Sequence, residues 1–207
     1  METGGKNAPA PASPNSGRVR CFILIMAIIF SVALIVLVIW FTIQPIKPHC
    51  SLEEFFIPRL NKASNDSQAV NSTAISLELS FFNRNSEKSI YYDNLDMTLY
   101  YYGKSLTSPI GNTSIPKFYQ QHRHTKHHAE TIQTFGVPWE DVKMKASNGS
   151  TAIFRVDLVM NVRYRNGIWK TRRHELRLGV NVTINDQGMK SVNHSLRLLV
   201  SRTTQKE

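Results

Sequence analysis

The chain has 207 residues and a formal net charge of +10, from 25 lysines and arginines against 15 aspartates and glutamates. The part that follows an apolar run near the N-terminus is long enough for one domain with its own hydrophobic core. The two cysteines, Cys21 and Cys50, lie on opposite sides of that run. If the run crosses a membrane, a disulfide within one chain is excluded, because it needs Cα atoms within about 7 Å of each other.

Residues 1–20 are rich in proline, alanine, glycine, serine and asparagine and include the run APAPASPNS. A segment of this composition buries too little apolar surface to offset the entropy of ordering. We therefore expect a disordered tail, which could recruit a partner by folding on contact.

Residues 21–43 read CFILIMAIIFSVALIVLVIWFTI and contain no charged side chain. At about 1.5 Å per residue they extend roughly 34 Å, enough to cross a hydrocarbon core of about 30 Å. A cleaved signal peptide is the alternative, but its shorter apolar core would end in small residues. This run ends in Trp40 and Phe41, which are typical of a membrane interface, so we predict a retained transmembrane helix.

The flanks of the run predict its orientation, because basic residues near a membrane stay on the cytoplasmic side. Lys6, Arg18 and Arg20 precede the run, whereas Lys47 is the only lysine or arginine in the first fifteen residues after it. A single-pass type II protein with an extracellular C-terminal domain follows. All six N-x-S/T sequons lie after the run and fit a glycosylated outer domain. Their asparagines are Asn65, Asn71, Asn112, Asn148, Asn181 and Asn193.

Each cysteine is a candidate for modification. Cys50 is an unpaired extracytoplasmic thiol, so it is either free or the site of an intermolecular disulfide that makes a homodimer. Cys21 lies at the inner edge of the membrane, where it is either palmitoylated or an unmodified lipid-facing residue.

After the apolar run, short segments alternate apolar and polar residues with a period of two, which is typical of half-buried β-strands. They cover residues 75–81, 95–101, 152–164, 176–184 and 196–200. Turn residues separate them at 83–86, 108–112, 147–149, 166–167 and 186–188. No stretch shows a strong helical period over ten or more residues. The pattern predicts an all-β sandwich, with one core shared between two sheets.

The predicted organisation comprises a disordered cytoplasmic tail (1–20), a transmembrane helix (21–43), a juxtamembrane segment with the first strand region (44–73), a β-sandwich outer domain (74–202) and a C-terminal tail (203–207).

The stretch FYQQHRHTKHH, residues 118–128, is the best candidate for chemistry. His124 and His128 would suit a metal on a helix, and His122 and His124 would suit one on a strand. However, the stretch has no carboxylate or cysteine, and Arg123 and Lys126 repel a cation. A catalytic histidine would lack a serine or cysteine partner. We therefore interpret the stretch as a solvated basic loop whose charge rises as its histidines protonate near pH 6.5, roughly their unperturbed pKa. No catalytic residue, metal site or cofactor is predicted.

Beyond the apolar run lie 22 of the 25 basic residues and 14 of the 15 acids, an excess of eight positive charges. The candidate basic contact surface consists of His122, Arg123, His124, Lys126, His127, His128, Arg163, Arg165, Arg172 and Arg173. Such charge is either ordinary solvation or a binding surface for a polyanion outside the cell, such as an acidic polysaccharide or anionic lipid. Nucleic acid is not expected in that compartment.

Five segments carry a resemblance to a known family. They are KPHCSLEEFFIPRL (47–60), SIYYDNLDMTLYY (89–101), SIPKFYQQH (114–122), NGSTAIFRVDL (148–158) and VRYRNGIWKTRRHELRLGVNVTI (162–184). In this order and spacing they resemble the plant non-race-specific disease resistance and harpin-induced-like family, and are most similar to its disease-resistance branch.

The resemblance implies a type II plasma-membrane glycoprotein with a late-embryogenesis-abundant type-two domain, an immunoglobulin- or fibronectin-III-like β-sandwich associated with defence and without enzymatic activity. The IYYD and FYQ motifs of the family match residues 90–93 and 118–120. The Asn-Pro-Asn signature falls on residues 83–85, with Arg84 in place of proline, which loses a fixed φ. The final SRTTQKE lacks the apolar tail of about 10 to 20 residues that a glycosylphosphatidylinositol anchor needs, so we expect the N-terminal helix alone to hold the membrane.

Two functions compete on these grounds. The first is an interaction protein of plant defence signalling at the plasma membrane, with residues 1–20 meeting a cytoplasmic immune-signalling protein and the basic outer domain contacting a cell-wall polyanion. The second is a structural stress-protective protein of the dehydration-tolerance type. The membrane helix and the six sequons favour the first, because protection of cytosolic components needs neither. An ectoenzyme would rest on the histidines alone.

Overall fold

The computed structural model describes residues 15–61, 72–103, 109–147 and 152–201. Helix α1 (Asn15–Ile43) covers the predicted apolar run and begins before it. Its segment Gly17–Trp40 has a mean hydropathy of 3.4 and is long and apolar enough to cross a membrane. The Ser31 hydroxyl donates a hydrogen bond to the carbonyl of Ala27 at 2.9 Å, so this polar group is satisfied within the helix, as a lipid environment requires.

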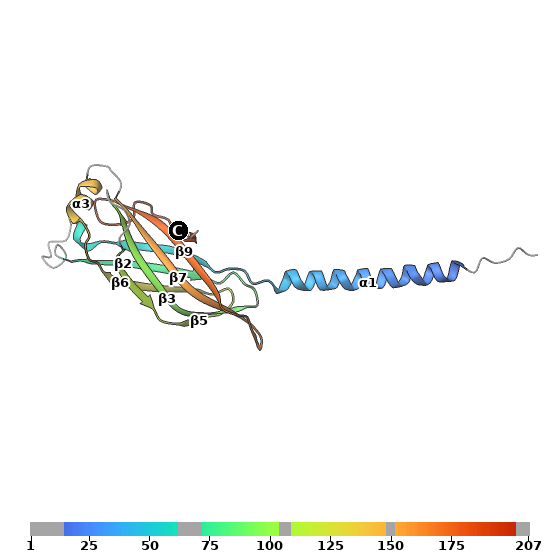
Figure 1. The fold of residues 1–207 in the computed structure, drawn as a ribbon. Coiled ribbons are helices and arrows are strands. Elements are labelled where there is room, and N and C mark those ends of the chain that lie inside the picture. Colours follow the sequence, from blue (N-terminus) through green and yellow to red (C-terminus); the bar gives the residue numbers. More distant parts are fainter. Residues whose placement is uncertain (1–14, 62–71, 104–108, 148–151, 202–207) are drawn as a thin grey trace, which may run out of the picture. The chain divides into compact units, whose positions relative to one another are not determined.

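After Gln44 the chain forms a second compact unit, the sandwich domain, built from two antiparallel sheets. In the described residues the first sheet has the order β10-β1-β2-β6, and the second has the order β11-β9-β7-β3-β4, with β5 beside β3 and β8 beside β7 (Figure 1). The elements are β1 (His49–Phe56), η1 (Pro58–Leu60), β2 (Ala74–Phe82), β3 (Ser89–Tyr102), β4 (Pro109–Ile115), β5 (Phe118–Gln120), β6 (Thr125–Gln133), α3 (Trp139–Ser147), β7 (Ala152–Asn166), β8 (Trp169–Lys170), β9 (His174–Ile184), β10 (Leu196–Arg197) and β11 (Leu199–Val200).

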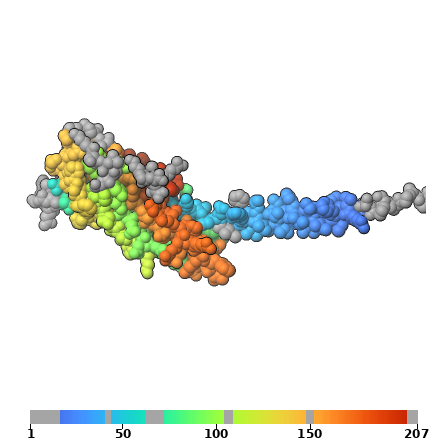
Figure 2. Space-filling model, in the orientation of Figure 1, coloured from blue at the N-terminus to red at the C-terminus, as the bar shows by residue number. Residues whose placement is uncertain are grey.

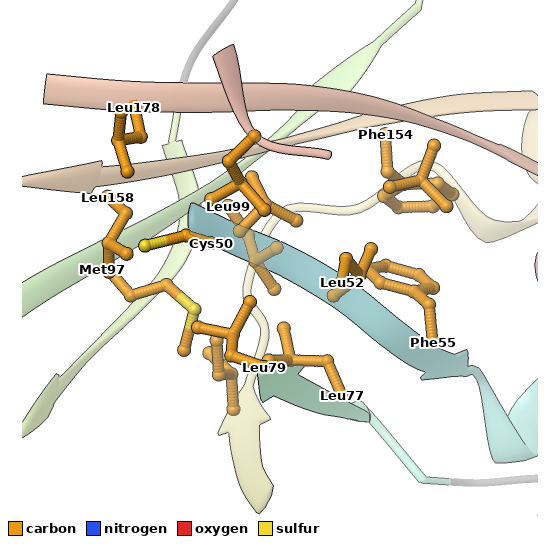
Figure 3. Close-up of a cluster of buried hydrophobic side chains, with 14 of the residues drawn as sticks. Cys50, Leu52, Phe55, Leu77, Leu79, Met97, Leu99, Phe154, Leu158 and Leu178 are labelled. Carbon is orange, nitrogen blue, oxygen red and sulfur yellow. The ribbon is translucent and has the colours of Figure 1, made fainter. Parts of the chain in front are cut away.

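The core lies between the two sheets and takes alternate side chains from each. Along β7, Phe154, Val156 and Leu158 are buried, and the intervening residues are more exposed. Figure 3 shows Leu52 of β1 and Leu79 of β2 in the same cluster as the side chains of β3, β7 and β9. The prediction of an all-β sandwich with a single N-terminal helix is therefore confirmed.

One predicted turn is wrong. Residues 108–112 were expected to turn because they contain proline, glycine and asparagine, but β4 begins at Pro109. Gly111 has another role, since a Cβ there would lie 2.8 Å from Cγ2 of Ile132 and 2.9 Å from the carbonyl oxygen of Gln133. The missing side chain thus allows β4 to approach β6 closely. By contrast, Gly167 and Gly188, at φ +56° and +78°, lie in predicted turns that need the left-handed conformation.

The short helix α3 was not predicted, because its nine residues are too few for a clear helical period. Pro138 precedes it, and Glu140 and Asp141 lie in its first turn, where carboxylates favour the positive end of the helix dipole. Tyr101 of β3 donates a hydrogen bond to Asp141 at 2.8 Å, which fastens α3 to the second sheet.

Strand register defines the two ends of the sandwich. His49, which begins β1, pairs with Phe82, which ends β2. A short turn leads to Ser89, which begins β3 and pairs with Arg165 near the end of β7. We call this the proximal end, because the chain arrives there from Ile46, and we call the opposite end, which carries α3, the distal end (Figure 1).

Candidate contact surface at the proximal end

Two segments far apart in the sequence, residues 90–93 (IYYD) and 118–120 (FYQ), lie side by side at the proximal end. The register pairs Ile90 with Gln120, Tyr91 with Tyr119, and Tyr92 with Phe118. Because side chains alternate along a strand, the two segments share an inner and an outer face.

On the inner face, Tyr92 and Gln120 form a buried polar pair. The Tyr92 hydroxyl donates a hydrogen bond to Oε1 of Gln120 at 2.8 Å, and burial raises the pKa of that hydroxyl well above its ordinary value. The amide nitrogen of Gln120 donates to the carbonyls of Phe81 at 2.6 Å and His124 at 2.7 Å. These contacts satisfy the buried groups and hold the chain where the His-rich stretch begins.

Residues 83–85 (Asn-Arg-Asn) join this region to the segment that precedes β1. Asn83 is fully buried and donates through its side chain to the carbonyls of Lys88 at 2.8 Å and Gln121 at 3.0 Å. The side chain of Asn85 accepts from the backbone N–H of Ile46 at 2.9 Å and donates to the Ile46 carbonyl at 2.8 Å. The two asparagines therefore fix the start of the sandwich domain.

The backbone of Asn83 also holds the His-rich turn. Its carbonyl accepts from the N–H of Arg123 at 3.0 Å, and its N–H donates to the carbonyl of His124 at 3.1 Å. Arg123 has φ +54°, a left-handed conformation that is uncommon for a residue other than glycine. Arg84 itself is exposed, so the contacts of the asparagines do not depend on a proline between them.

On the outer face, Tyr91 and Tyr119 lie with ring centroids 4.7 Å apart, at the distance of an aromatic pair. Arg165 donates to the Tyr91 hydroxyl at 3.0 Å, and Nζ of Lys170 lies 5.1 Å from the centroid of the same ring. The Tyr119 hydroxyl donates to the Ser89 hydroxyl at 2.8 Å. The outer face is thus an aromatic pair bordered by cations.

Asp93 partly neutralises this face. It lies 3.1 Å from Arg163 and 3.1 Å from Arg173 through its two carboxylate oxygens. Within the described part of the chain, Arg165, Lys170 and Arg172 form no ion pair with a carboxylate. The face therefore keeps an excess of positive charge.

The His-rich stretch is a loop only between β5 and β6, where His122 and His124 lie. Its first three residues form β5, and from Thr125 it forms β6, in which His127 pairs with Ser80 of β2. The loop interpretation is therefore wrong for residues 118–120 and for residues 125–128, which include Lys126, His127 and His128. In the described residues β6 is an edge strand of its sheet, a position at which charged side chains are common, so its polar composition hid it.

The histidines of β6 have different surroundings, and the expectation of a common pKa near 6.5 is wrong for His128. The exposed His127 places Nδ1 2.9 Å from a carboxylate oxygen of Glu78. The half-buried ring of His128 lies 4.5 Å from that of Phe118 and 5.8 Å from that of Phe81. Burial, followed by the nearby charge of Lys126, lowers the pKa of His128.

The fold brings the predicted basic residues to one end of the sandwich. These are His122, Arg123, His124, Lys126, His127, His128, Arg163, Arg165, Arg172 and Arg173. We define the first six as the His-rich edge and the other four, with Lys170, as the arginine face. Sequence reasoning did not assign Tyr91, Tyr119 and Lys170 to this surface, although the alternation in SIYYD already places Tyr91 opposite the buried Tyr92.

No set of three or more histidine, cysteine, aspartate or glutamate side chains that could hold a metal ion occurs among the described residues.

Three proteins of one plant, with related names, are similar to this chain. Over 184 residues the chain is 28% identical to Protein NDR1 of Arabidopsis thaliana, covering 86% of this chain and 82% of that protein. It is 35% identical over 104 residues to the NDR1/HIN1-like protein 1 of the same plant, covering 50% and 48% of the two chains, and 32% identical over 110 residues to its NDR1/HIN1-like protein 26, covering 52% and 49%. The chain is thus similar to Protein NDR1 over most of its length and to the NDR1/HIN1-like proteins over about half of it. The names of these relatives denote no enzyme.

No protein-family model matches the chain. A solved structure of a protein from Archaeoglobus fulgidus covers 69% of this chain and 98% of its own, with 8% identity and a TM-score of 0.34, which is too loose to bear on function.

Cys50 does not lie on the surface of the sandwich domain. Its side chain is 1% exposed in the core beside Met97 and Leu99, and burial raises the pKa of its thiol to about 12 (Figure 3). A thiol in this position cannot reach a second chain unless the core opens, so its burial argues against the predicted intermolecular disulfide. Cys21 is exposed on α1, and its palmitoylation stays a prediction.

Three of the predicted glycosylation sites can be placed. Asn112, Asn181 and Asn193 are exposed, and Asn181 alternates with the buried Val182 as the strand pattern predicts. Asn65, Asn71 and Asn148 lie outside the described residues.

Proposed function

We propose that this chain is a defence-related interaction protein of the plant plasma membrane, held by α1 with the sandwich domain outside the cell, and that its basic proximal end contacts an acidic polymer of the cell wall. The similarity to Protein NDR1 over 86% of the chain is the observation that carries this proposal, and α1, which is long and apolar enough to cross a membrane, supports the anchoring.

The type II orientation has two independent supports. The cluster of basic residues lies before α1, as cytoplasmic flanks require. The three sequon asparagines of the described residues are exposed on the sandwich domain, where an oligosaccharide could be attached during transport to the cell surface.

The contact with an acidic polymer is supported by the charge of the proximal end. The His-rich edge and the arginine face carry cations from four separate segments, and only a few acids, such as Glu78 and Asp93, lie among them. A polymer of regularly spaced carboxylates would meet several of these cations at once, which gives attraction at low salt and screening at high salt.

The polymer contact can be tested with the full chain in lipid nanodiscs and immobilised polygalacturonate. We expect binding that weakens with salt and that is lost in a variant with His122, Arg123, His124, Lys126 and His127 changed to glutamine. His128 is kept because it packs against Phe118. The matched control changes Lys143 and Arg177, which lie away from the proximal end, and should bind like the wild type.

Equal binding of the two variants, or equal binding to a neutral polysaccharide, would refute the polymer contact. The role of residues 1–20 as a site for a cytoplasmic immune-signalling protein remains a separate prediction, since residues 1–14 lie outside the described part of the chain.

A further inference from the structure

The hairpin between β7 and β8 carries the most exposed large apolar side chains of the described sandwich domain, Ile168 at 85% and Trp169 at 77%. Its turn is built on Asn166 and Gly167, with Gly167 at φ +56°, as a tight β-hairpin requires. The Arg165 guanidinium donates to the carbonyl of Gly167 at 2.7 Å. The hairpin therefore has a fixed shape that holds two apolar side chains out in solvent.

The base of the hairpin is held equally firmly. The N–H of Thr171 donates to the carbonyl of Tyr164 at 2.8 Å, and the Thr171 hydroxyl accepts from the N–H of Tyr164 at 3.0 Å. Isolated exposed apolar residues are ordinary on protein surfaces. Two adjacent ones at the tip of a braced hairpin keep most of their apolar surface in water, which is unfavourable and indicates a partner outside the domain.

Basic residues surround the apolar tip. Arg165 and Lys170 flank it directly, and Arg172 and Arg173 follow within four residues. Of these four, only Arg173 lies within ion-pair distance of a carboxylate in the described residues, that of Asp93. Tryptophan at headgroup depth, next to lysine and arginine that attract anionic headgroups, is the composition with which proteins attach to a bilayer surface.

The hairpin lies at the proximal end of the sandwich. The backbone of Ile46 is hydrogen-bonded to the side chain of Asn85. The turn that contains Asn85 leads to Ser89, which pairs with Arg165 at the base of the hairpin. Ile46 follows the end of α1 by three residues, a reach of about 10 Å. In Figure 2 this part of the chain, coloured orange, protrudes from the proximal end of the sandwich. A bilayer that holds α1 is therefore within reach of this end.

The two placeable sequons on strands of the same sheet, at Asn112 and Asn181, lie away from the hairpin. Asn181 pairs with Arg155, ten residues before Arg165 on β7, a distance of about 30 Å along the strand. Asn112 pairs with Thr98 in the distal half of β3. No sequon begins between residues 149 and 180. A hydrophilic glycan would prevent a surface from approaching lipid, and the hairpin has no acceptor for one.

We propose that Ile168 and Trp169 insert into the headgroup region of the bilayer that α1 spans, and that Arg165, Lys170 and Arg172 bind anionic lipid headgroups there. The inference rests on the membrane anchoring proposed above. It gives the sandwich domain a second attachment to the membrane and so restricts its orientation. Lys126, His127 and His128 of the His-rich edge lie on β6 of the other sheet, so this edge remains available for an acidic polymer.

The experiment uses the full chain in vesicles made from ordinary or brominated phospholipid, because bromine quenches tryptophan that enters the bilayer. The change Trp40→Phe removes the tryptophan of α1. Of the two that remain, Trp139 belongs to α3 at the distal end and lies under the guanidinium of Arg59, so it serves as an internal reference.

We expect brominated lipid to quench part of the emission of the Trp40→Phe chain and to lose that effect when Trp169→Phe is added. Quenching should increase when the vesicles contain phosphatidylserine. It should decrease when Ile168→Ser removes part of the apolar tip, or when Lys170→Gln and Arg172→Gln remove two of the positive charges beside it. Unchanged emission of Trp139 confirms that the variants are folded.

Emission of Trp169 that brominated lipid leaves unchanged, in vesicles that retain the chain after a carbonate wash, would overturn the inference and leave the anchor intact. Emission that depends on protein density and not on bromination would identify a second copy as the partner and would also overturn it. Release of the chain by carbonate would contradict the anchoring proposal itself, and the inference with it.

Discussion

The two ends of the sandwich domain are built differently. At the proximal end, buried side chains of Asn83, Asn85 and Gln120 bond to backbone groups of neighbouring segments and hold the turns. At the distal end, the side chain of Asn185 also bonds to backbone groups, those of Gln187 and Met189, but it does so in an exposed turn. Losing a buried hydrogen bond leaves its partner unsatisfied, whereas water can replace an exposed one. The turns at the end with the cations, the aromatic pair and the apolar hairpin should therefore be more sensitive to loss of their side-chain hydrogen bonds than the turn at Asn185.

The largest expected effect separates the two ends directly. Asn83→Ala removes two N–H donors and leaves the buried carbonyl of Lys88 without a partner, at roughly 1–3 kcal/mol, and it also removes the partly buried bond to the carbonyl of Gln121. Asn185→Ala removes the acceptor of an exposed turn, where water replaces it, and should cost about 1 kcal/mol or less. Urea unfolding of the full chain in detergent compares the two. Equal losses would contradict the difference between the ends.

A smaller effect is expected from a matched pair of tyrosines. Tyr92→Phe leaves Oε1 of Gln120 buried without a donor and should reduce the free energy of unfolding by about 1–2 kcal/mol. Tyr101→Phe removes a hydrogen bond to Asp141, but Asp141 keeps its ion pair with Lys145 at 2.9 Å. This substitution should therefore reduce the free energy of unfolding by less. The same unfolding experiment decides the order, and a costlier Tyr101→Phe would refute it.

The sequence predicted the inner strands of the sheets better than the edge strands. Alternation along β7 and β9 located the strands and the buried residues correctly, because each of these strands has one face in the core. It failed for β6, whose edge position admits Lys126 and His127, and for β4, whose Gly111 serves packing and not a turn.

The basic residues of the candidate site could be predicted from the sequence, but their arrangement on one surface could not. The two groups of basic residues were found from charge alone, but strand pairing, which the sequence does not state, brings them to one end. The burial of Cys50 was likewise missed, because a bulge after Leu52 interrupts the alternation that would have revealed it.

Acid should weaken the domain through His128. Because burial lowers its pKa in the folded chain, the unfolded chain takes up the proton first as the pH falls below about 6.5, so stability decreases with falling pH. His49, whose pKa burial also lowers, acts in the same direction. His128→Leu should flatten the dependence of the urea midpoint on pH between 7.5 and 5, roughly the range in which histidine titrates. The exposed His122→Gln is the control, and equal slopes in wild type and His128→Leu would contradict this account.

The smallest effect is expected at Cys50. In a Cys21→Ser chain, the remaining thiol should resist maleimide until the domain unfolds, since it is buried and its pKa is raised. Non-reducing gels should show no dimer. Rapid labelling of the folded chain, or a dimer band that Cys50→Ser abolishes, would show that the thiol is accessible.

The most direct test of the proximal end as a functional contact surface is complementation of a plant that lacks this protein. Two variants are compared for pathogen growth: one with His122, Arg123, His124, Lys126 and His127 changed to glutamine, and the control with Lys143 and Arg177 changed. The account predicts that the first fails and the control restores resistance, at equal abundance and glycosylation. Full rescue by the first variant would show that the basic proximal end is only a solvated surface.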